Sequence, residues 1–169
     1  MWDLRRATPE DAPAVANVHV RSWQVGYQGL MPAAALAELR AEDRAARYTF
    51  HRTGPDDPAT FVAVDTDESI RGFVTLGPCP DDEPSNVGQL WALYVDPDFW
   101  GRGVGKVLIT LARSRLVDLG FDEAVLWVLR GNERAERFYR QDGWVSEDVI
   151  RSDVVWGVRV EEKRYRTSL

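Results

Sequence analysis

The sequence predicts an α/β (α+β) fold with a mixed sheet, its segments in the order βααβββαβαββ. Apolar residues recur at helical spacing in segments such as 103–119, and short runs rich in β-branched and aromatic residues, such as 61–64, are typical of strands. Two runs, 90–95 and 124–129, are apolar on both faces, as strands covered on both sides are. No repeat or linker divides the chain, so we expect a single domain over residues 1–169.

The N-terminal part predicts a strand and two helices. Residues 2–7 form the expected strand, and Thr8 followed by Pro9 and two acids is a typical helix start. One face of this helix carries Val15, Val18, His19 and Ser22. The run 26–32 (GYQGLMP) breaks the helix, and residues 33 to about 48 predict a second one. Its apolar side would hold Leu36, Leu39, Ala46 and Phe50.

The middle of the chain predicts a hairpin, a central strand and a long helix. Residues 61–64 and 70–76 are the two strands of the hairpin, and an acidic loop, 78–86, follows them. The central strand, 90–95, ends at an Asp-Pro pair. Helical periodicity then covers 103–119, and a glycine directly after it is well placed to end the helix.

The C-terminal part predicts a strand, a short helix and a closing pair of strands. The strand is 124–129, and the helix is 132–141, stopped by Gly143. Residues 144–150 and 154–165 are expected to form a closing antiparallel pair.

Composition excludes several classes of function. Cys79 is the only cysteine, so no intramolecular disulfide can form, and with two histidines a zinc site of Cys and His is not expected. The net charge of −6 argues against nucleic-acid binding. No apolar run reaches the roughly 18 residues of a membrane span, and the N-terminus does not resemble a signal peptide. We therefore expect a cytoplasmic protein without a metal, a membrane or a nucleic acid as partner.

A glycine-rich segment, Trp100–Lys106 (WGRGVGK), lies between the central strand and the long helix. Three glycines expose backbone N–H groups at a helix N-terminus, which favours a phosphate or pyrophosphate. A dinucleotide fingerprint starting at Gly101 would need glycine at Lys106, and a phosphate-binding P-loop would need Ser or Thr at Val107. Neither pattern fits, and a turn that merely starts a helix remains the alternative.

A second motif begins at Asn132 and reads N-x-x-A-x-x-F-Y, followed by a glycine and an aromatic, Gly143-Trp144. Together with Leu93–Pro97 (LYVDP) and the glycine-rich segment, it resembles the GCN5-related N-acetyltransferase (GNAT) family. The resemblance covers essentially the whole chain. It implies a mixed, largely antiparallel sheet flanked by helices, and acetyl-CoA as co-substrate.

The resemblance also implies the cofactor-binding residues. Backbone amides would hold the pyrophosphate of coenzyme A at Arg102, Gly103, Val104, Gly105 and Lys106. The main chain of Leu93, Tyr94 and Val95 would pair with the pantetheine arm and polarise the acetyl carbonyl. Asn132 would hydrogen-bond the arm or nearby backbone, although it is otherwise an ordinary helix cap. The family has Gln or Arg where this chain has Trp100, so a side-chain contact to phosphate is not expected there.

The resemblance further implies that Tyr139 is the catalytic acid and contacts the cofactor. A phenol with a pKa of about 10 is protonated at neutral pH and can donate to a departing thiolate. Its helical spacing from Ala135 would also suit a plain core residue.

The general base and the acceptor are less well defined. Gln89 stands where many members of the family have Glu, and an amide cannot act as a base. The remaining candidates for the base are His19, Tyr27, Asp81, Asp82 and Glu83. By analogy, residues 23–32 and 78–86 would form much of the acceptor site. The acids of the second segment would attract cationic amines, unless they are simply a solvated surface.

The sequence therefore predicts an acetyl-CoA-dependent N-acetyltransferase in which an amine attacks the thioester directly. The acceptor would be a small-molecule amine or a protein amine, and a homodimer is the default assembly. A catalytically silent acyl-CoA sensor is the alternative, favoured by Trp100 and Gln89. A nucleotide-phosphate-binding protein is a weaker alternative, because both loop patterns fail.

Overall fold

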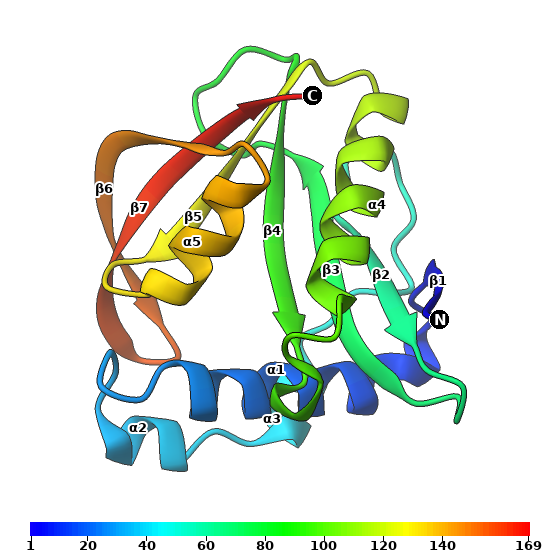
Figure 1. The fold of residues 1–169 in the computed structure, drawn as a ribbon, viewed down its shortest axis with the longest axis vertical. Helices are drawn as coiled ribbons and strands as arrows, with labels where there is room; N and C mark the ends of the chain where they lie inside the picture. The colour runs from blue at the N-terminus through cyan, green and yellow to red at the C-terminus, as the bar shows by residue number, and fades with distance from the viewer.

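The computed structural model describes residues 1–169 and contains one seven-stranded sheet in the order β1-β2-β3-β4-β5-β7-β6 (Figure 1). The strands are β1 Asp3–Arg6, β2 Ala59–Val64, β3 Ile70–Pro78, β4 Val87–Val95, β5 Glu123–Leu129, β6 Val145–Val155 and β7 Val158–Ser168. The helices are α1 Ala12–Gly26, α2 Ala33–Ala37, α3 Ala41–Ala45, α4 Val104–Asp118 and α5 Glu133–Gln141. Only β4 and β5 are parallel. The mixed, largely antiparallel sheet is therefore confirmed.

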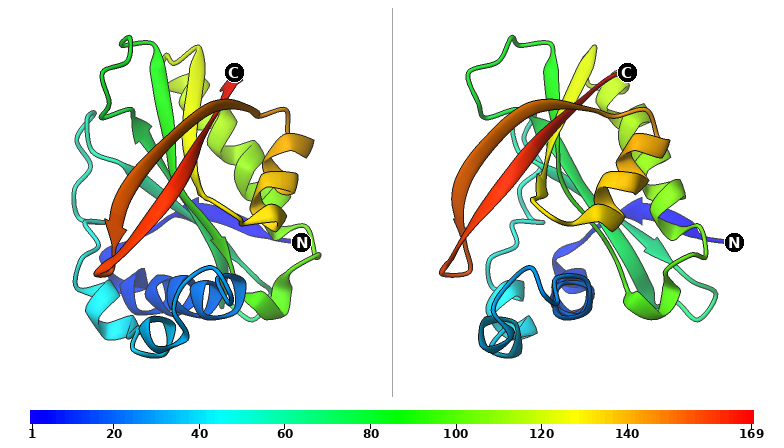
Figure 2. Two further views of the ribbon diagram at one scale, coloured as in Figure 1. Left: turned by 90° about the vertical axis from the view of Figure 1, so that its left-hand side faces the viewer. Right: turned by 60° about the vertical axis from the view of Figure 1, so that its left-hand side comes forward.

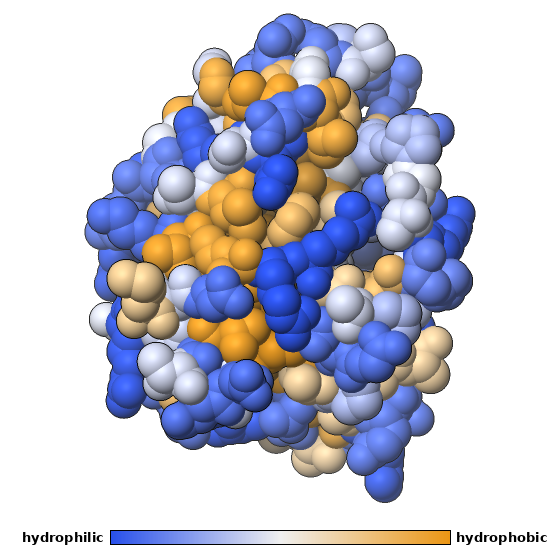
Figure 3. All heavy atoms as spheres, turned by 90° about the vertical axis from the view of Figure 1, so that its right-hand side faces the viewer, coloured by the Kyte–Doolittle hydropathy of each residue, from blue (hydrophilic) through white to orange (hydrophobic).

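Helices cover both faces of the sheet. Helices α4 and α5 pack on one face over the largest core cluster, and α1 packs on the other face against β3 and β4. Gly72 of β3 allows α4 to approach closely, because a Cβ there would lie 2.8 Å from Val104 and 3.0 Å from Leu108. On the face shown in Figure 3, apolar side chains form a band surrounded by hydrophilic ones.

The β6–β7 hairpin curves away from the rest of the sheet, and its tip reaches the end of α1 (Figure 2). There Trp23, Met31, Leu36, Leu129 and Val160 form a separate buried cluster. This cluster holds the hairpin against the α1–α2 segment. A space remains between β4 and the hairpin.

The sheet is splayed between its two parallel strands. The ladder of β4 and β5 has only three pairs and ends at Gln89 opposite Val125. Beyond it the register of β3 and β4 shifts, so that Leu76 pairs with Leu90 and Thr75 with Ala92, leaving Trp91 as a bulged residue. From Leu90 onward β4 therefore has no neighbour on the β5 side.

Two sequence predictions of elements were wrong in detail. Residues 33–48 form two short helices rather than one, with Arg40 extended between them. Leu36 packs at the hairpin tip while Phe50 packs under β2 and β3, and Ala46 is exposed. One straight helix could not place apolar side chains in both clusters. The closing strands also have no break at 151–153, because the turn lies at Trp156 and Gly157, both with positive φ.

The predicted helix start is confirmed. The Asp11 carboxylate accepts a hydrogen bond from the Thr8 N–H at 2.8 Å, which completes a capping box. The face with Val15, Val18, His19 and Ser22 is buried as expected. None of the helices has both the length and the apolar character needed to cross a membrane.

Candidate active site

The free edge of β4 is the first part of the site. Asp96 donates its N–H to the Arg71 carbonyl, and backbone groups alternate in direction along an antiparallel pair. The N–H and C=O groups of Leu93 and Val95 therefore point away from β3. They face the gap where β5 has diverged. Apart from the Val95 carbonyl, which accepts from Trp100, they can hydrogen-bond to an extended ligand as an added strand would.

The glycine-rich loop is the second part. Gly101 and Gly103 have φ of +74° and +85°, a conformation that glycine adopts without strain. The backbone N–H groups without an acceptor in the protein are those of Gly101, Gly103, Val104, Gly105 and Lys106. They surround the N-terminus of the 15-residue helix α4. Free N–H groups at a helix N-terminus form a binding site for an anion.

Trp100 is part of the site. Its Nε1 donates to the Val95 carbonyl at 2.9 Å, and its ring packs against the core. The Arg134 guanidinium carbon lies 3.2 Å from the centre of this ring. Burial alone lowers the pKa of Arg134, with no neighbouring acid to raise it. A cation from α5 therefore lies on the indole, beside the loop.

Helix α5 contributes Asn132 and Tyr139. Asn132 caps the helix, because its Oδ1 accepts from the Ala135 N–H at 3.2 Å, and its amide N–H groups stay available. Tyr139 is 8% exposed and lines the cavity. Burial, and to a lesser degree the nearby Tyr94, raises its pKa well above the usual value, and its hydroxyl has no hydrogen-bond partner in the protein. Tyr139 is therefore a protonated donor at neutral pH.

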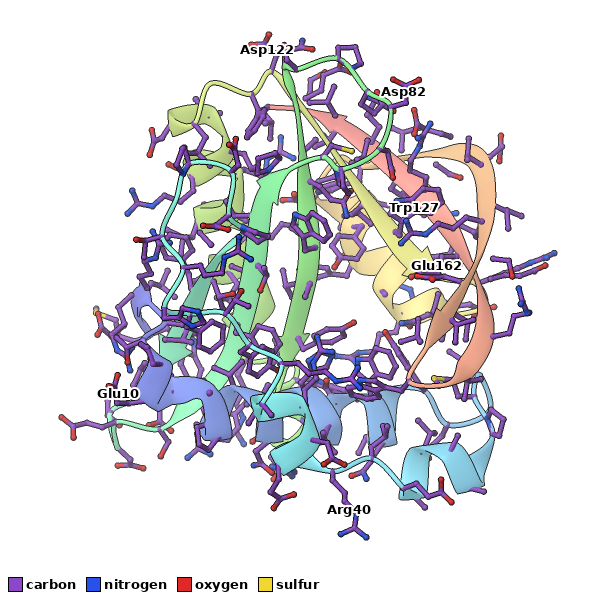
Figure 4. All side chains as sticks on the ribbon, turned by 180° about the vertical axis from the view of Figure 1, so that it is seen from behind. Glu10, Arg40, Asp82, Asp122, Trp127 and Glu162 are labelled. Carbon is purple, nitrogen blue, oxygen red and sulfur yellow. The ribbon has the colours of Figure 1, made fainter.

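A cavity of about 930 Å³ joins these parts and passes through the splayed sheet. On the side of α4 and α5, it is lined by the loop, Asn132 and Tyr139. On the side of α1, it is lined by Tyr27, Arg44, Trp127, Arg151, Trp156 and Glu162. In Figure 4, Trp127 of β5 and Glu162 of β7 lie on the same side of the sheet. One ligand can thus approach from each face and meet the other at the edge of β4.

The structure brings most of the residues predicted from the sequence together. Nine of the ten cofactor-binding candidates line the cavity: Leu93, Tyr94, Val95, Gly103, Val104, Gly105, Lys106, Asn132 and Tyr139. Arg102 does not, because its guanidinium lies over Phe99 and its carbonyl accepts from Trp2. No cluster of three or more His, Cys, Asp or Glu side chains is arranged to hold a metal ion.

The acidic loop does not line the cavity as expected. Only Pro80 of residues 78–86 borders it, and Asp82 lies at the outer edge of the molecule (Figure 4). Glu83 is neutralised by Arg164 at 3.2 Å and Arg166 at 2.7 Å. The loop is held against β7 by these ion pairs, so the structure does not support it as a guide for cationic amines.

His19 and Tyr27 line the cavity but are poor bases. His19 is 4% exposed and its ring stacks on Tyr94 at 4.6 Å, with Nδ1 3.0 Å from the Tyr48 hydroxyl. Burial, and then the positive charge of Arg44, holds the pKa of His19 well below 6.5. Burial and then Tyr94 raise the pKa of Tyr27 well above its usual value. The residues missed in the sequence are Arg44, Arg134 and Glu162, which carry no local motif.

The pKa of His19 predicts a stability effect. Below about pH 6.5 the unfolded chain binds a proton that the folded state excludes, so stability falls as pH is lowered. From pH 7.0 to 5.5 we expect a loss of about 1 kcal/mol in the free energy of unfolding, measured by urea denaturation. His19→Gln should lack this loss. An equal loss in both proteins would show that His19 is not the cause of the loss.

Comparisons with known proteins agree with this geometry. The model of the acetyltransferase (GNAT) family matches residues 18–144. The chain belongs to the GNAT acetyltransferase family. It is therefore an N-acetyltransferase, and its co-substrate is acetyl-CoA.

Individual relatives of this GNAT acetyltransferase vary in length and activity. An uncharacterized N-acetyltransferase of Bacillus subtilis is 28% identical over 78% of this chain and 74% of that protein. The spermidine N(1)-acetyltransferase of Thermoplasma acidophilum is 24% identical over 98% of both chains. The mycothiol acetyltransferase of Thermobifida fusca is 38% identical over 64% of this chain, but this chain spans only 34% of that protein.

The fold of the GNAT acetyltransferase is also found in solved structures. The PaiA N-acetyltransferase of Thermoplasma acidophilum, crystallised in complex with coenzyme A, superimposes with a TM-score of 0.75. It is 21% identical in sequence, and the match covers 100% of this chain and 99% of that chain.

Proposed function

We propose that residues 1–169 form one catalytic unit that transfers the acetyl group of acetyl-CoA to a primary amine by direct attack on the thioester. One observation carries the proposal. The free edge of β4, the five unpaired N–H groups at α4 and the unbonded hydroxyl of Tyr139 all border one cavity that is open to both faces of the sheet. This arrangement holds donor and acceptor together, so no acyl-enzyme is needed.

The donor is held by the main chain. The N–H groups of residues 101 and 103–106 bind the pyrophosphate, and Leu93 and Val95 hydrogen-bond the pantetheine arm. An N–H from this edge polarises the acetyl carbonyl as its oxygen gains charge. As the amine nitrogen bonds to the carbonyl carbon, the carbon–sulfur bond breaks. Tyr139 then donates its phenolic proton to the departing sulfur.

The amine must lose a proton, and Glu162 is placed to receive it. Among the carboxylates that border the cavity, Asp142 is bound by Trp144 and Arg113, and Asp153 is half exposed. Glu162 lies on the acceptor side with its side chain 16% exposed, and Arg151 Nε donates to it at 3.0 Å. A carboxylate at this position can accept the proton that the amine loses.

Arg134 binds phosphate in place of the Trp100 side chain, which cannot. We predict that Arg134→Met weakens binding of CoA about 5-fold, because one exposed charge contact to the pyrophosphate is lost. Binding of pantetheine, which lacks the phosphates, should not change. Calorimetric titration of both ligands checks this, with Arg137→Met on the exposed side of α5 as the control. An equal loss for pantetheine would show that Arg134 acts only by packing on Trp100.

The proposed function is tested by release of CoA thiol from acetyl-CoA across a panel of primary amines. We expect release that depends on the amine, and initial rates that form intersecting lines when both substrates are varied. Parallel lines would indicate an acyl-enzyme and contradict direct attack. Release that is the same without amine would contradict acetyl transfer.

A further inference from the structure

Arg44 of α3 is a cation without a counter-ion at the acceptor end of the cavity. Its Nε is buried and has no hydrogen-bond acceptor. The guanidinium carbon lies 5.4 Å from the ring centre of Tyr48 and 5.5 Å from that of Trp156. These rings hold the side chain in place but offer it no negative charge. A partly desolvated arginine with an unused donor is costly unless a ligand supplies the acceptor.

The position of Arg44 is close to the reaction centre. Trp156, which lies against Arg44, packs on His19 with ring centres 5.2 Å apart. His19 in turn stacks on Tyr94, which lies between the two β4 residues with free backbone groups. The charge of Arg44 also contributes to the low pKa of His19. The guanidinium therefore lies on the α1 side of the sheet, next to the edge of β4.

The other charges on this side do not neutralise Arg44. Arg151 already binds the two carboxylates that line this side of the cavity, Glu162 at 3.0 Å and Asp153 at 3.9 Å. Arg47 also lines the cavity, and no carboxylate pairs with it. The buried Nε1 of Trp127 lacks an acceptor as well. The acceptor end thus has unused hydrogen-bond donors and an excess of positive charge.

We propose that the acceptor is an amine that also carries a carboxylate, as an α-amino acid does, and that Arg44 binds this carboxylate. The inference rests on the proposed function and names its substrate class. A carboxylate accepts two parallel hydrogen bonds from one guanidinium, which fixes its orientation. The amine of the same molecule can then face Glu162 and the edge of β4. A polyamine would instead place further positive charge beside Arg44, which the local charge disfavours.

The test compares α-amino acids with their carboxamides, which differ only in the anionic group. CoA thiol release gives kcat/KM for each pair. For the best pair, we expect the acid to exceed the amide at least about 10-fold, the low end for a hydrogen bond to a charged group. Arg44→Gln should lower kcat/KM for the acid by the same factor and leave that for the amide within about 2-fold. Arg40→Gln is the matched control, because Arg40 is exposed and points away from the cavity (Figure 4).

Preference for amides or for spermidine, or an equal loss for acid and amide in Arg44→Gln, would overturn the inference and leave amine acetylation intact. Absence of release with every amine would instead contradict the proposed function. In that case calorimetric titration of the CoA-bound protein decides. Acids that bind the parent but not Arg44→Gln support the carboxylate site, and acids and amides that bind equally to both proteins overturn it.

Discussion

Tyr139→Phe should lower kcat about 100-fold while the affinity for acetyl-CoA stays within about 2-fold of the parent. The ring that packs against Trp144 and Phe138 is kept, and only the hydroxyl is removed. Because this hydroxyl has no partner in the protein, the free energy of unfolding should not fall. Steady-state kinetics and urea denaturation of the same preparation provide both values.

Tyr165→Phe is the matched control for this variant. Tyr165 is fully buried, and its hydroxyl donates to Glu136 at 2.6 Å. Removing it should cost about 1–3 kcal/mol of stability and leave kcat unchanged. The two substitutions should thus have opposite effects on kcat and on stability. An unchanged kcat in Tyr139→Phe would mean that water or the amine protonates the thiolate, and a large loss of stability would make Tyr139 a core residue.

Gly103→Val should abolish the rise in melting temperature that acetyl-CoA causes. A Cβ at this position meets no protein atom within 4 Å, so the space that it would fill is open to the ligand. Backbone N–H groups can bind a pyrophosphate only if the ligand approaches the chain closely. With a Kd raised about 100-fold, ligand concentrations that stabilise the parent by about 3 kcal/mol would stabilise the variant by less than 1.

Gly120→Val separates this effect from backbone strain. Gly120 also has a positive φ, +91°, and open space at its Cβ, but it lies at the opposite end of α4. Both variants should lose stability without ligand because valine is strained at such angles. Only Gly103→Val should lose the response to acetyl-CoA. A full response in Gly103→Val would exclude the loop as the pyrophosphate site.

Features set by local chemistry could be predicted from the sequence. Thr8 and Asp11 are three residues apart, and their capping box depends on nothing else. Gly101 and Gly103 precede a long apolar helix, and Asn132 and Tyr139 share one short helix. Most of the residues of these motifs line one cavity in the structure, because each motif includes its own geometry.

The acceptor side depends on contacts that no local pattern shows. Arg44, Trp156 and Glu162 come together only because the β6–β7 hairpin folds onto the end of α1. The acids of residues 78–86 suggested a negative approach to the site, but Glu83 is paired with arginines of β7. Pairing of this kind cancels the charge on which the expected field depends. Helical periodicity likewise could not show that residues 33–48 divide between two core clusters.

The most direct test of the account is a titration of the 15N-labelled protein with CoA, followed by the amide NMR signals. We predict that the largest shifts occur at Gly101, Gly103, Val104, Gly105 and Lys106, whose N–H groups are unpaired, and at Leu93 and Val95 on the free edge of β4. If the protein is saturated with CoA and the signals of other amides shift while those of these seven do not, the account is contradicted.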